Sequence, residues 1–397
     1  MTRIGLIRET KTPADNRVAL IPSQCKWLQK SFPSLKIYAQ PSTVRCYTDR
    51  EYEMAGVELK EDLSGCDFLF GIKETAIESL VPGKKYLFFS HTRKMQPYNR
   101  KLFRAILDKK ITLIDYECME HEDGQRILGF GFFAGVVGAH NGMLAYGKRT
   151  GEFTLPRVYQ QPSFKHLIHQ YFGVRLPRLK IVITGSGRVA HGLLEVMNLL
   201  GIIEVEPDEY LGRNFAYPVF TQLKGGLLYG SKDGTAYNRE HFHKEPESYN
   251  CLFRPYTEAS DILMNGIYWD PRMPRLFGWD DMTKPEFRIR TIADITDDKD
   301  GSVPCNLGDC PMEDPVYGVD RQTRQRTAPY LEGSVDIMAV GNLPNELPRD
   351  ASRYFGEQLI KFVLEDLFKE GSPVIQRATM VKEGRITEGY GYLENYA

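Results

Sequence analysis

The stretch Lys180-Ile-Val-Ile-Thr-Gly-Ser-Gly-Arg-Val-Ala-His-Gly192 decides the fold of the middle of this 397-residue chain. A run of strand-forming residues leads into a glycine turn, and apolar residues at helical spacing follow it. Gly185 permits the turn, Gly187 allows the backbone to approach a phosphate, and the small Ala190 lets the helix pack on the strand. The helix N-terminus then offers unpaired N–H groups and a positive dipole end. The pattern predicts a dinucleotide-binding strand–turn–helix unit at mid-chain.

The composition is that of an ordinary globular protein and argues against several functional classes. The chain is 42% apolar and 26% charged, with a net charge of −1, so it has no basic field for nucleic acid or a membrane surface. Residues 1–7 resemble a first strand rather than a signal peptide, and no apolar run approaches the ~20 residues of a membrane span. The seven cysteines are scattered, which favours reduced thiols and a cytoplasmic location. His241 and His243 lie in a charged segment and are interpreted as surface residues, so no metal site is expected.

The first 140 residues alternate short apolar runs with polar helical segments, which predicts a parallel sheet built from βαβ units. The expected strands are 4–7, 37–39, 68–72, 86–90 and 112–116, and the expected helices are 23–32, 48–54 and 96–109.

A second sheet is predicted from the strands 180–184, 202–205, 262–267 and 289–294. Residues 132–147 are rich in small residues and favour a long helix that connects two domains. Residues 208–250 are interpreted as an insertion, and residues 311–331 as a loop-like return. Residues 352–367 show the apolar spacing of a helix.

Charged residues recur where the predicted strands of the first sheet end. Ligands of doubly wound sheets bind at the carboxyl ends of the strands. A lysine and a histidine that meet there could transfer protons, and burial or a nearby cation would lower the pKa of the lysine. We therefore expect a functional site rather than solvated strand ends. The residues are Arg17, Lys73, Glu74, His91 and Glu117.

Several longer motifs follow in a fixed order along the chain. They are Arg8-Glu-Thr-Lys-Thr-Pro-Ala-Asp-Asn-Arg-Val-Ala-Leu-Ile-Pro22, Gly71-Ile-Lys-Glu74, Leu87-Phe-Phe-Ser-His-Thr-Arg-Lys94, Tyr116-Glu-Cys-Met-Glu-His-Glu-Asp-Gly-Gln-Arg-Ile-Leu-Gly-Phe-Gly131, Asp261-Ile-Leu-Met-Asn-Gly-Ile-Tyr-Trp269, Ile292-Ala-Asp-Ile-Thr296 and Asn342-Leu-Pro-Asn-Glu-Leu-Pro-Arg-Asp-Ala-Ser352. Together they resemble the alanine dehydrogenase/pyridine nucleotide transhydrogenase superfamily. Within it they are most similar to the NAD-dependent, lysine-forming saccharopine dehydrogenase branch.

This resemblance implies an α/β fold with two Rossmann-like domains, whose parallel sheets are separated by an active-site cleft. Residues 1–138 and 325–397 would form a discontinuous substrate domain, and residues 139–324 the NAD-binding domain. The implied reaction is the reversible NAD-dependent cleavage of saccharopine to lysine and 2-oxoglutarate, by hydride transfer and imine hydrolysis.

The resemblance also implies roles for the strand-end residues. Lys73 and His91 match the acid–base pair of the family; we assign Lys73 to deprotonation of the amine and His91 to hydrolysis of the imine, and the two roles could be reversed. The neighbouring acids would tune that pair, and several cations would suit the three carboxylates of saccharopine. The acids are Glu74 and Glu117, and the cations are Arg17, Lys94 and Arg126.

The cofactor residues are expected in the middle domain. Gly185, Ser186, Gly187, Arg188 and Val189 should surround the pyrophosphate. Glu206 fits the acid that binds the adenosine ribose, which favours NAD over NADP, and Glu204 and Asp208 are its rivals. The nicotinamide side is expected to involve Asn265, Tyr268 and Asp298, with Asp294 and Asp297 as alternatives to the last.

Two other functional readings compete with this one. The first is alanine dehydrogenase or another amino-acid or opine dehydrogenase of the superfamily; alanine has a single carboxylate and would need fewer cations than Lys94 and Arg126 supply. The second is a non-catalytic NAD(H)-binding sensor or transhydrogenase-like subunit, which would need neither Lys73 nor His91. Small-molecule partners are expected, without nucleic acid or membrane, and the oligomeric state is left open.

Overall fold

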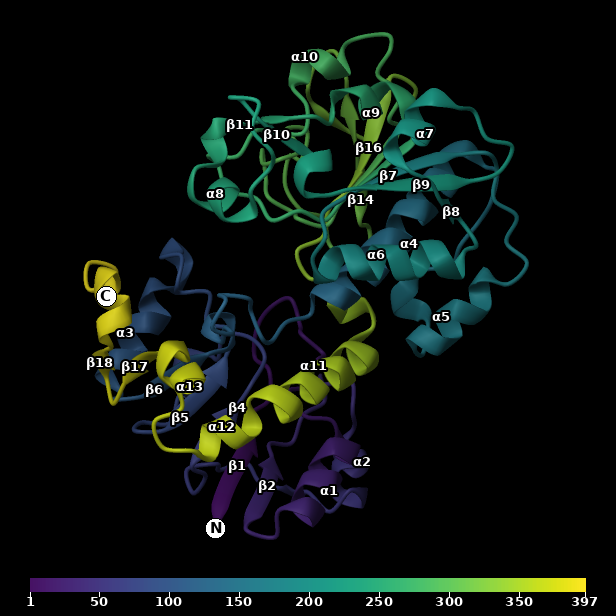
Figure 1. Ribbon diagram of the computed structural model, residues 1–397. Coiled ribbons are helices and arrows are strands. Elements are labelled where there is room, and N and C mark those ends of the chain that lie inside the picture. Colours follow the sequence, from purple (N-terminus) through teal and green to yellow (C-terminus); the bar gives the residue numbers. More distant parts are fainter. The chain divides into compact units, whose positions relative to one another are not determined.

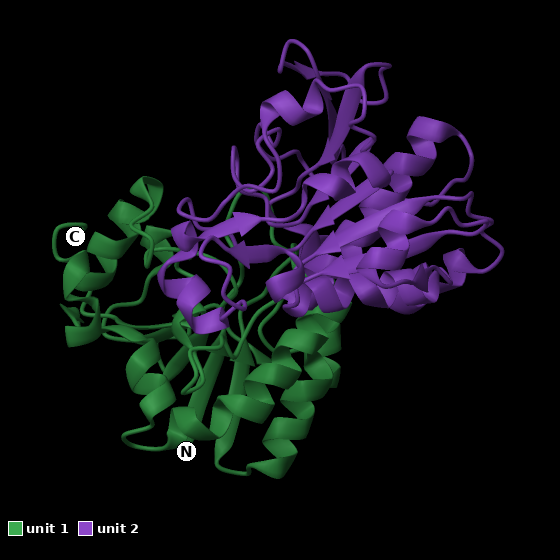
Figure 2. Cartoon of the chain, turned by 45° about the horizontal axis from the view of Figure 1, so that its top comes forward, with its two compact units in different colours: residues 1–130, 348–397 green, residues 131–347 purple.

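The computed structural model describes residues 1–397 and divides them into two compact units, shown in Figure 2. Unit 1 comprises Met1–Phe130 and Pro348–Ala397, and unit 2 comprises Gly131–Leu347. The boundaries expected from the sequence fall at different places, within helix α4 (Gly131–Thr150) and between the paired strands β14 (Val316–Asp320) and β15 (Arg326–Thr327). A continuous helix and a hairpin each fold as one piece, so the unit boundaries lie outside them. None of the helices combines the length and apolarity needed to cross a membrane.

Unit 1 is built on an eight-stranded sheet in the order β18-β17-β6-β5-β4-β1-β2-β3. Strands β1 to β6 are parallel to one another, and most of their buried residues are apolar, as expected for a sheet that helices cover on both faces. The strands are β1 (Thr2–Leu6), β2 (Leu35–Ala39), β3 (Glu58–Leu59), β4 (Phe68–Phe70), β5 (Lys85–Phe88), β6 (Thr112–Asp115), β17 (Thr379–Lys382) and β18 (Arg385–Ile386). The helices are α1 (Pro22–Ser31), α2 (Asp49–Met54), α3 (Arg100–Asp108), α11 (Pro348–Phe362), α12 (Leu364–Phe368) and α13 (Pro373–Ala378), with short 3-10 turns such as η3 (Tyr116–Cys118).

The C-terminal segment completes this sheet. Figure 1 shows β17 and β18, in yellow, beside β6, where β17 pairs antiparallel with β6. The sequence analysis did not identify these two strands. β18 pairs antiparallel with β17 across the turn Glu383–Gly384, where both residues have positive φ. The other partner of β17 is β6, which lies more than 250 residues earlier in the chain.

Unit 2 contains a second eight-stranded sheet, in the order β15-β14-β16-β13-β12-β7-β9-β8. Its strands are β7 (Lys180–Thr184), β8 (Ile203–Glu204), β9 (Val219–Leu223), β12 (Ile262–Asn265), β13 (Thr291–Asp294), β14, β15 and β16 (Ser334–Met338), and β10 (Tyr229–Ser231) and β11 (Tyr249–Cys251) form a separate hairpin. Its helices are α4, α5 (Phe164–Tyr171), α6 (Arg188–Leu199), α7 (Pro207–Gly212), α8 (Arg239–Lys244), α9 (Arg254–Ala259) and α10 (Trp279–Met282), with 3-10 turns η4 (Val158–Gln160) and η7 (Leu343–Glu346).

Two sequence interpretations in this unit are wrong. The segment interpreted as an insertion contains β9, which is the direct neighbour of β7 in the sheet. The segment interpreted as a loop contains β14 and β15. Thr221 in β9 and Gly318 in β14 are buried, so polar or small residues interrupt the apolar pattern of these strands and weaken their signal in the sequence.

Close packing of α4 on α6 holds the glycine turn in place. A Cβ atom added to Gly135 in α4 would lie 2.0 Å from the Val189 carbonyl oxygen, and one added to Gly192 in α6 would lie 2.0 Å from the Phe132 carbonyl oxygen. The two backbones therefore approach more closely than any residue with a side chain allows. This contact fixes the first half of α6, which follows the turn directly.

A buried acid–amide pair joins α4 to η7. Asn141 Nδ2 donates to Glu346 Oε1 at 2.7 Å, while Asn141 Oδ1 and Glu346 Oε2 are both buried without a hydrogen-bond partner. Burial, with a smaller contribution from Glu313, raises the pKa of the Glu346 carboxyl to about 7, against the lowering effects of Asn141 and Arg157. A protonated Glu346 is therefore the form that suits this interior, since it adds the donor that the pair lacks.

We expect Glu346 to make the protein less stable as the pH rises. Its folded-state pKa of about 7 lies above the ordinary value of 4.5, so the stabilising effect of its proton is complete below pH 4.5 and is lost as the pH rises through about 7. The loss amounts to about 3 kcal/mol near pH 8. Glu346→Gln keeps the shape and supplies a permanent donor, so its free energy of unfolding in urea should exceed that of the wild type at about pH 8.5. Identical pH dependence of the two proteins would contradict the assignment.

Candidate functional site

The Lys73 side chain lies just beyond the carboxyl end of β4 in unit 1. Gly71 begins the turn that carries it, and a Cβ there would lie 2.7 Å from Ile7 Cδ1. Lys73 is half-buried and its ammonium has no hydrogen bond or ion pair within the chain. Burial and the charge of the Arg17 guanidinium lower the pKa of Lys73 to about 8, against the raising effect of Asp15. The structure thus holds an amine that can be neutral near physiological pH, as the strand-end argument expects.

His91 lies at the end of the neighbouring strand β5 and faces Glu74. The pairing of Phe70 with Leu87 brings Glu74 level with His91 when the register is continued. His91 Nδ1 lies 2.7 Å from Glu74 Oε1. His91 has a left-handed backbone, with φ of 51°, which turns its ring at the strand end. With Nδ1 directed to the carboxylate, Nε2 is left to exchange a proton with a substrate or water.

The Glu74 carboxylate has hydrogen bonds to other side chains besides His91. Asn99 Nδ2 donates to Glu74 Oε1 at 3.1 Å and Lys11 Nζ donates to Oε2 at 3.0 Å. Burial alone would raise the pKa of Glu74, but its hydrogen bond to His91, the charge of His91 and the hydrogen bond from Asn99 hold the pKa well below the ordinary value. Glu74 therefore remains a carboxylate and orients the imidazole.

Arg17 is more enclosed than a surface cation. Its Nε and Nη2 donate to the two oxygens of Asp15 at 2.9 and 2.5 Å, and its guanidinium stacks 4.1 Å from the centre of the Phe130 ring. Burial would raise the pKa of Asp15, but the charge and hydrogen bonds of Arg17 hold it well below the ordinary value. Both side chains are buried, so the pair is a fixed charged element beside Lys73.

The other predicted substrate residues follow β5 and β6. Arg126 Nη2 donates to Glu117 Oε1 at 2.9 Å, and Glu117 itself is buried while Arg126 is about half exposed. Lys94 is exposed on the segment after His91. All seven residues predicted for the catalytic and substrate sites therefore lie in unit 1, and Lys73, Glu74, His91 and Arg17 form one connected electrostatic group.

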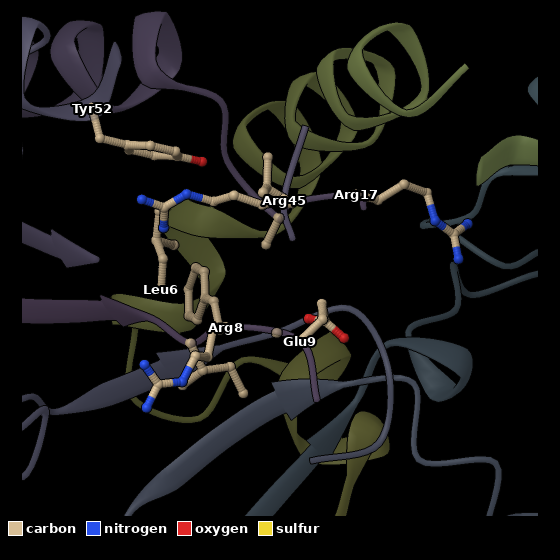
Figure 3. A pocket seen from close by; sticks show the side chains of 11 residues that line it. Leu6, Arg8, Glu9, Arg17, Arg45 and Tyr52 are labelled. Carbon is tan, nitrogen blue, oxygen red and sulfur yellow. The ribbon is translucent and has the colours of Figure 1, made fainter. Parts of the chain in front are cut away.

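Sequence analysis missed Glu9, which belongs to the same group. Its two carboxylate oxygens accept the backbone N–H groups of Ile72 and Lys73 at 2.7 and 2.9 Å. In Figure 3, Arg8 and Glu9 point to different sides of the chain beyond β1, and Arg8 pairs with Glu61 instead. The strand-end rule that singles out Lys73 and His91 applies equally to Glu9, because it too follows an apolar strand.

The glycine turn of unit 2 has the shape that a pyrophosphate requires. Gly185 has φ of 106°, and a Cβ there would lie 2.6 Å from the Gly266 carbonyl oxygen, so only glycine fits. Gly187 is exposed, and a Cβ there would meet nothing within 4 Å. No side chain caps the N-terminus of the 12-residue α6, so its first-turn N–H groups can bind an anion. Ser186 is exposed, and Arg188 and Val189 form the first turn of α6.

The residues predicted for the nicotinamide side differ in how deeply they are buried. Asn265 is fully buried at the end of β12, where its amide donates to Asp294 Oδ1 and Ser302 Oγ and accepts from Thr184 Oγ1. Its side chain therefore links the ends of β7, β12 and β13 by hydrogen bonds. Tyr268 is 65% exposed, and Asp298 is exposed on the acidic turn. Burial raises the pKa of the rival Asp294 to about 6. Burial, with Asp294 and Asp309, raises the pKa of the rival Asp297 to about 7.

The sheet order changes the expectation for the adenosine ribose. Glu206 follows β8, which is an edge strand, and β9 lies between β8 and β7. Glu206 thus stands two strand spacings, roughly 10 Å, from β7. The strand beside β7 ends at Leu223, and exposed Lys224 follows it, with its Nζ donating to Gln222 Oε1 at 3.1 Å. A lysine therefore follows the strand beside β7, whereas Glu206, the acid expected from the sequence, follows the edge strand β8.

One family model and several known proteins are similar to this chain. The family model described as the alanine dehydrogenase/PNT N-terminal domain matches residues 5–137. Over 98% of its length the chain is 31% identical to alpha-aminoadipic semialdehyde synthase, mitochondrial, of Mus musculus, and it spans 47% of that protein. It therefore spans about half the length of the first curated relatives that it matches.

Two further similarities cover whole chains. The chain is 26% identical to saccharopine dehydrogenase (NAD(+), L-lysine-forming) of Candida glabrata, with 93% of each protein aligned. It superposes on the solved structure of an L-alanine dehydrogenase with a TM-score of 0.67, covering 100% of this chain and 99% of that one at 15% identity. The predicted fold class of two Rossmann-like domains with mainly parallel sheets is confirmed.

Proposed function

We propose that this chain is a nicotinamide-dependent oxidoreductase that cleaves saccharopine to lysine and 2-oxoglutarate. Residues 5–137 match the alanine dehydrogenase/PNT N-terminal domain, and the chain is similar to saccharopine dehydrogenases along nearly its whole length. The observation that carries the proposal is the group at the ends of β4 and β5. Lys73, with a pKa lowered to about 8, is followed in the chain by Glu74, the carboxylate that orients His91. Two proton-transfer groups with different environments are what oxidation and hydrolysis of a secondary amine need.

The protein residues divide the proton transfers. Lys73, when neutral, takes the proton of the substrate's secondary amine while hydride leaves the Cα of its glutamate portion, and an imine forms. The bound nicotinamide ring supplies the acceptor for that hydride. As water attacks the imine carbon, His91 takes a proton from it through Nε2, and protonated Lys73 returns its proton to the nitrogen. His91 then gives its proton to the same nitrogen and takes the hydroxyl proton of the carbinolamine as the C–N bond breaks, so that lysine and 2-oxoglutarate are released.

The cations of unit 1 suit a substrate with several carboxylates. Arg126 is half exposed although it pairs with Glu117, and Lys94 is exposed. Asp15 holds the Arg17 side chain in place. We therefore assign Arg17 the role of a fixed positive charge rather than that of a side chain that moves to contact the substrate. These residues favour saccharopine over alanine as the substrate. Their contacts with it, and the predicted cytoplasmic location, stay predictions.

The turn 185–187 and the uncapped start of α6 fit a dinucleotide pyrophosphate, and the cofactor we propose from the sequence is NAD. Lys224 supports NADP as the alternative, because a cation at the end of the strand beside β7 can pair with a ribose 2′-phosphate. Arg188 begins α6 directly after the turn and is assigned to the pyrophosphate.

The decisive experiment compares two substrate pairs with two cofactors. Purified protein is given lysine with 2-oxoglutarate, or ammonia with pyruvate, each with NADH or NADPH, and the loss of reduced-nicotinamide absorbance is followed. We expect turnover with lysine and 2-oxoglutarate only. Turnover with ammonia and pyruvate would identify an alanine dehydrogenase instead. Tight binding of reduced cofactor without turnover of either pair would identify a binding subunit. Higher activity with NADH would favour Glu206 as the residue that binds the ribose, and higher activity with NADPH would favour Lys224.

A further inference from the structure

The turn that carries Lys73 keeps only part of its pairing with the sheet. β4 ends at Phe70, and beyond it the Gly71 N–H donates to the Leu87 carbonyl and the Ile72 carbonyl accepts from the Phe89 N–H, both at 2.9 Å. The next two N–H groups, those of Ile72 and Lys73, have no strand to pair with. Both donate to Glu9, one to each carboxylate oxygen.

A carboxylate that bridges two consecutive N–H groups fixes the peptide plane between them. That plane sets the direction in which the Lys73 side chain leaves the backbone, since the Cα–Cβ bond follows from it. The Lys73 ammonium has no hydrogen-bond or ion-pair partner in the chain. The position of the amine therefore depends on the backbone conformation at Lys73. We propose that Glu9 is the positioning residue of Lys73, holding the 71–74 turn so that the amine lies at the reaction site.

The burial of Glu9 and its neighbour Asp15 disfavour the charged carboxylate, whereas the two N–H groups and Arg17 favour it. Burial and the negative charge of Asp15 raise the pKa of Glu9 to about 8, while the hydrogen bonds from Ile72 and Lys73 and the charge of Arg17 oppose this rise. The charged groups that face it are thus Asp15 and Arg17 from the segment after β1 and Lys73 from the turn after β4. A carboxylate can accept both N–H groups fully, whereas an uncharged amide must turn its NH₂ group toward one of them. Glutamine at this position therefore loses one of the two bonds.

The inference rests on the proposed function for its kinetic readout, so the test includes a readout that needs no turnover. The variants are Glu9→Gln, Glu9→Asp and Thr10→Val in the full chain. Thr10→Val is the matched control, because Thr10 Oγ1 accepts the N–H of Ala76 at 3.0 Å and so tethers the same turn beyond Lys73. In every variant the lysines are dimethylated with ¹³C-formaldehyde, and the Lys73 signal, assigned by its loss in Lys73→Arg, is titrated by NMR.

Glu9→Gln is expected to lower the pKa of Lys73 relative to the wild type, because it removes the negative charge that Glu9 gains near the ammonium as the pH rises through about 8. Its kcat should fall roughly 10- to 100-fold, with the KM for cofactor unchanged, since a misplaced base costs that much. Glu9→Asp should restore the pKa but not kcat, because the shorter carboxylate keeps the charge and cannot bridge both N–H groups. Thr10→Val should match the wild type in both.

Two results would overturn the inference. One is a Lys73 titration that is the same in Glu9→Gln, Thr10→Val and the wild type. The other is a Glu9→Asp variant with full kcat. Absence of turnover in the wild type would instead count against the proposed function, and the NMR titration would still decide the role of Glu9. Far-ultraviolet circular dichroism of each variant checks that it is folded.

Discussion

Replacing Lys73 with methionine is expected to lower kcat for saccharopine oxidation roughly 10²–10⁴-fold, the usual contribution of a positioned general base. Methionine has similar length and fills the same half-buried space, so the fold should persist, but it cannot take a proton. The pH profile should change as well. Lys73 has a pKa lowered to about 8 and acts when neutral, so wild-type oxidation should rise with pH through about 8. Steady-state kinetics across pH should show that this limb is missing from Lys73→Met.

The matched control is Lys85→Met. Lys85 begins β5 and is exposed, so it belongs to the same pair of strands as the site but stands at their amino ends. This variant should keep wild-type kcat and pH profile. Cofactor binding, measured by fluorescence titration, should be the same in both variants because the glycine turn belongs to unit 2. Full activity of Lys73→Met with an unchanged pH profile would refute the assigned role.

Replacing Gly192 with valine is expected to cost more than about 4 kcal/mol of stability, at the severe end of single substitutions. The new Cβ would lie 2.0 Å from the Phe132 carbonyl oxygen and 2.7 Å from the Val136 nitrogen. Both atoms belong to the backbone, so no side-chain rotation relieves the clash, and α6 must move away from α4. Thermal unfolding followed by circular dichroism measures the effect, and the cofactor should no longer bind.

Gly187→Ala separates folding from binding in the same region. A Cβ at Gly187 meets nothing within 4 Å, so this variant should unfold at the wild-type temperature. Its added methyl group stands where the backbone is expected to approach the pyrophosphate, so calorimetric titration should show weakened cofactor binding. A stable Gly192→Val, or a Gly187→Ala that binds cofactor as tightly as the wild type, would contradict the account of the turn.

Much of the candidate site could be predicted because a simple rule applies to it. Parallel strands bring their carboxyl ends to one edge of a sheet, so Lys73 and His91 could be paired from their places after two apolar strands. Glu9 obeys the same rule and was missed, since its motif drew attention to the cation Arg17. The ribose position could not be found in this way. It depends on which strand lies beside β7. That strand is β9, which lies in a polar segment and therefore has a weak apolar signal.

The Glu346–Asn141 pair marks the other limit of sequence reasoning. Its partners are 205 residues apart, and each is unremarkable where it stands in the chain. The pKa of Glu346 is a property of the interior that encloses it, and no spacing pattern encodes that interior.

The sequence by itself determined the elements whose causes are local. The strand, glycine turn and helix at 180–199 follow from neighbouring residues, and the strand-end charges follow from where apolar runs stop. Only the tertiary structure decided which strands are neighbours, which amides Glu9 holds, and how far burial and Arg17 lower the pKa of Lys73. The physical reason is that hydrogen bonding, desolvation and charge act over a few ångströms in space, and the groups involved come from distant parts of the chain.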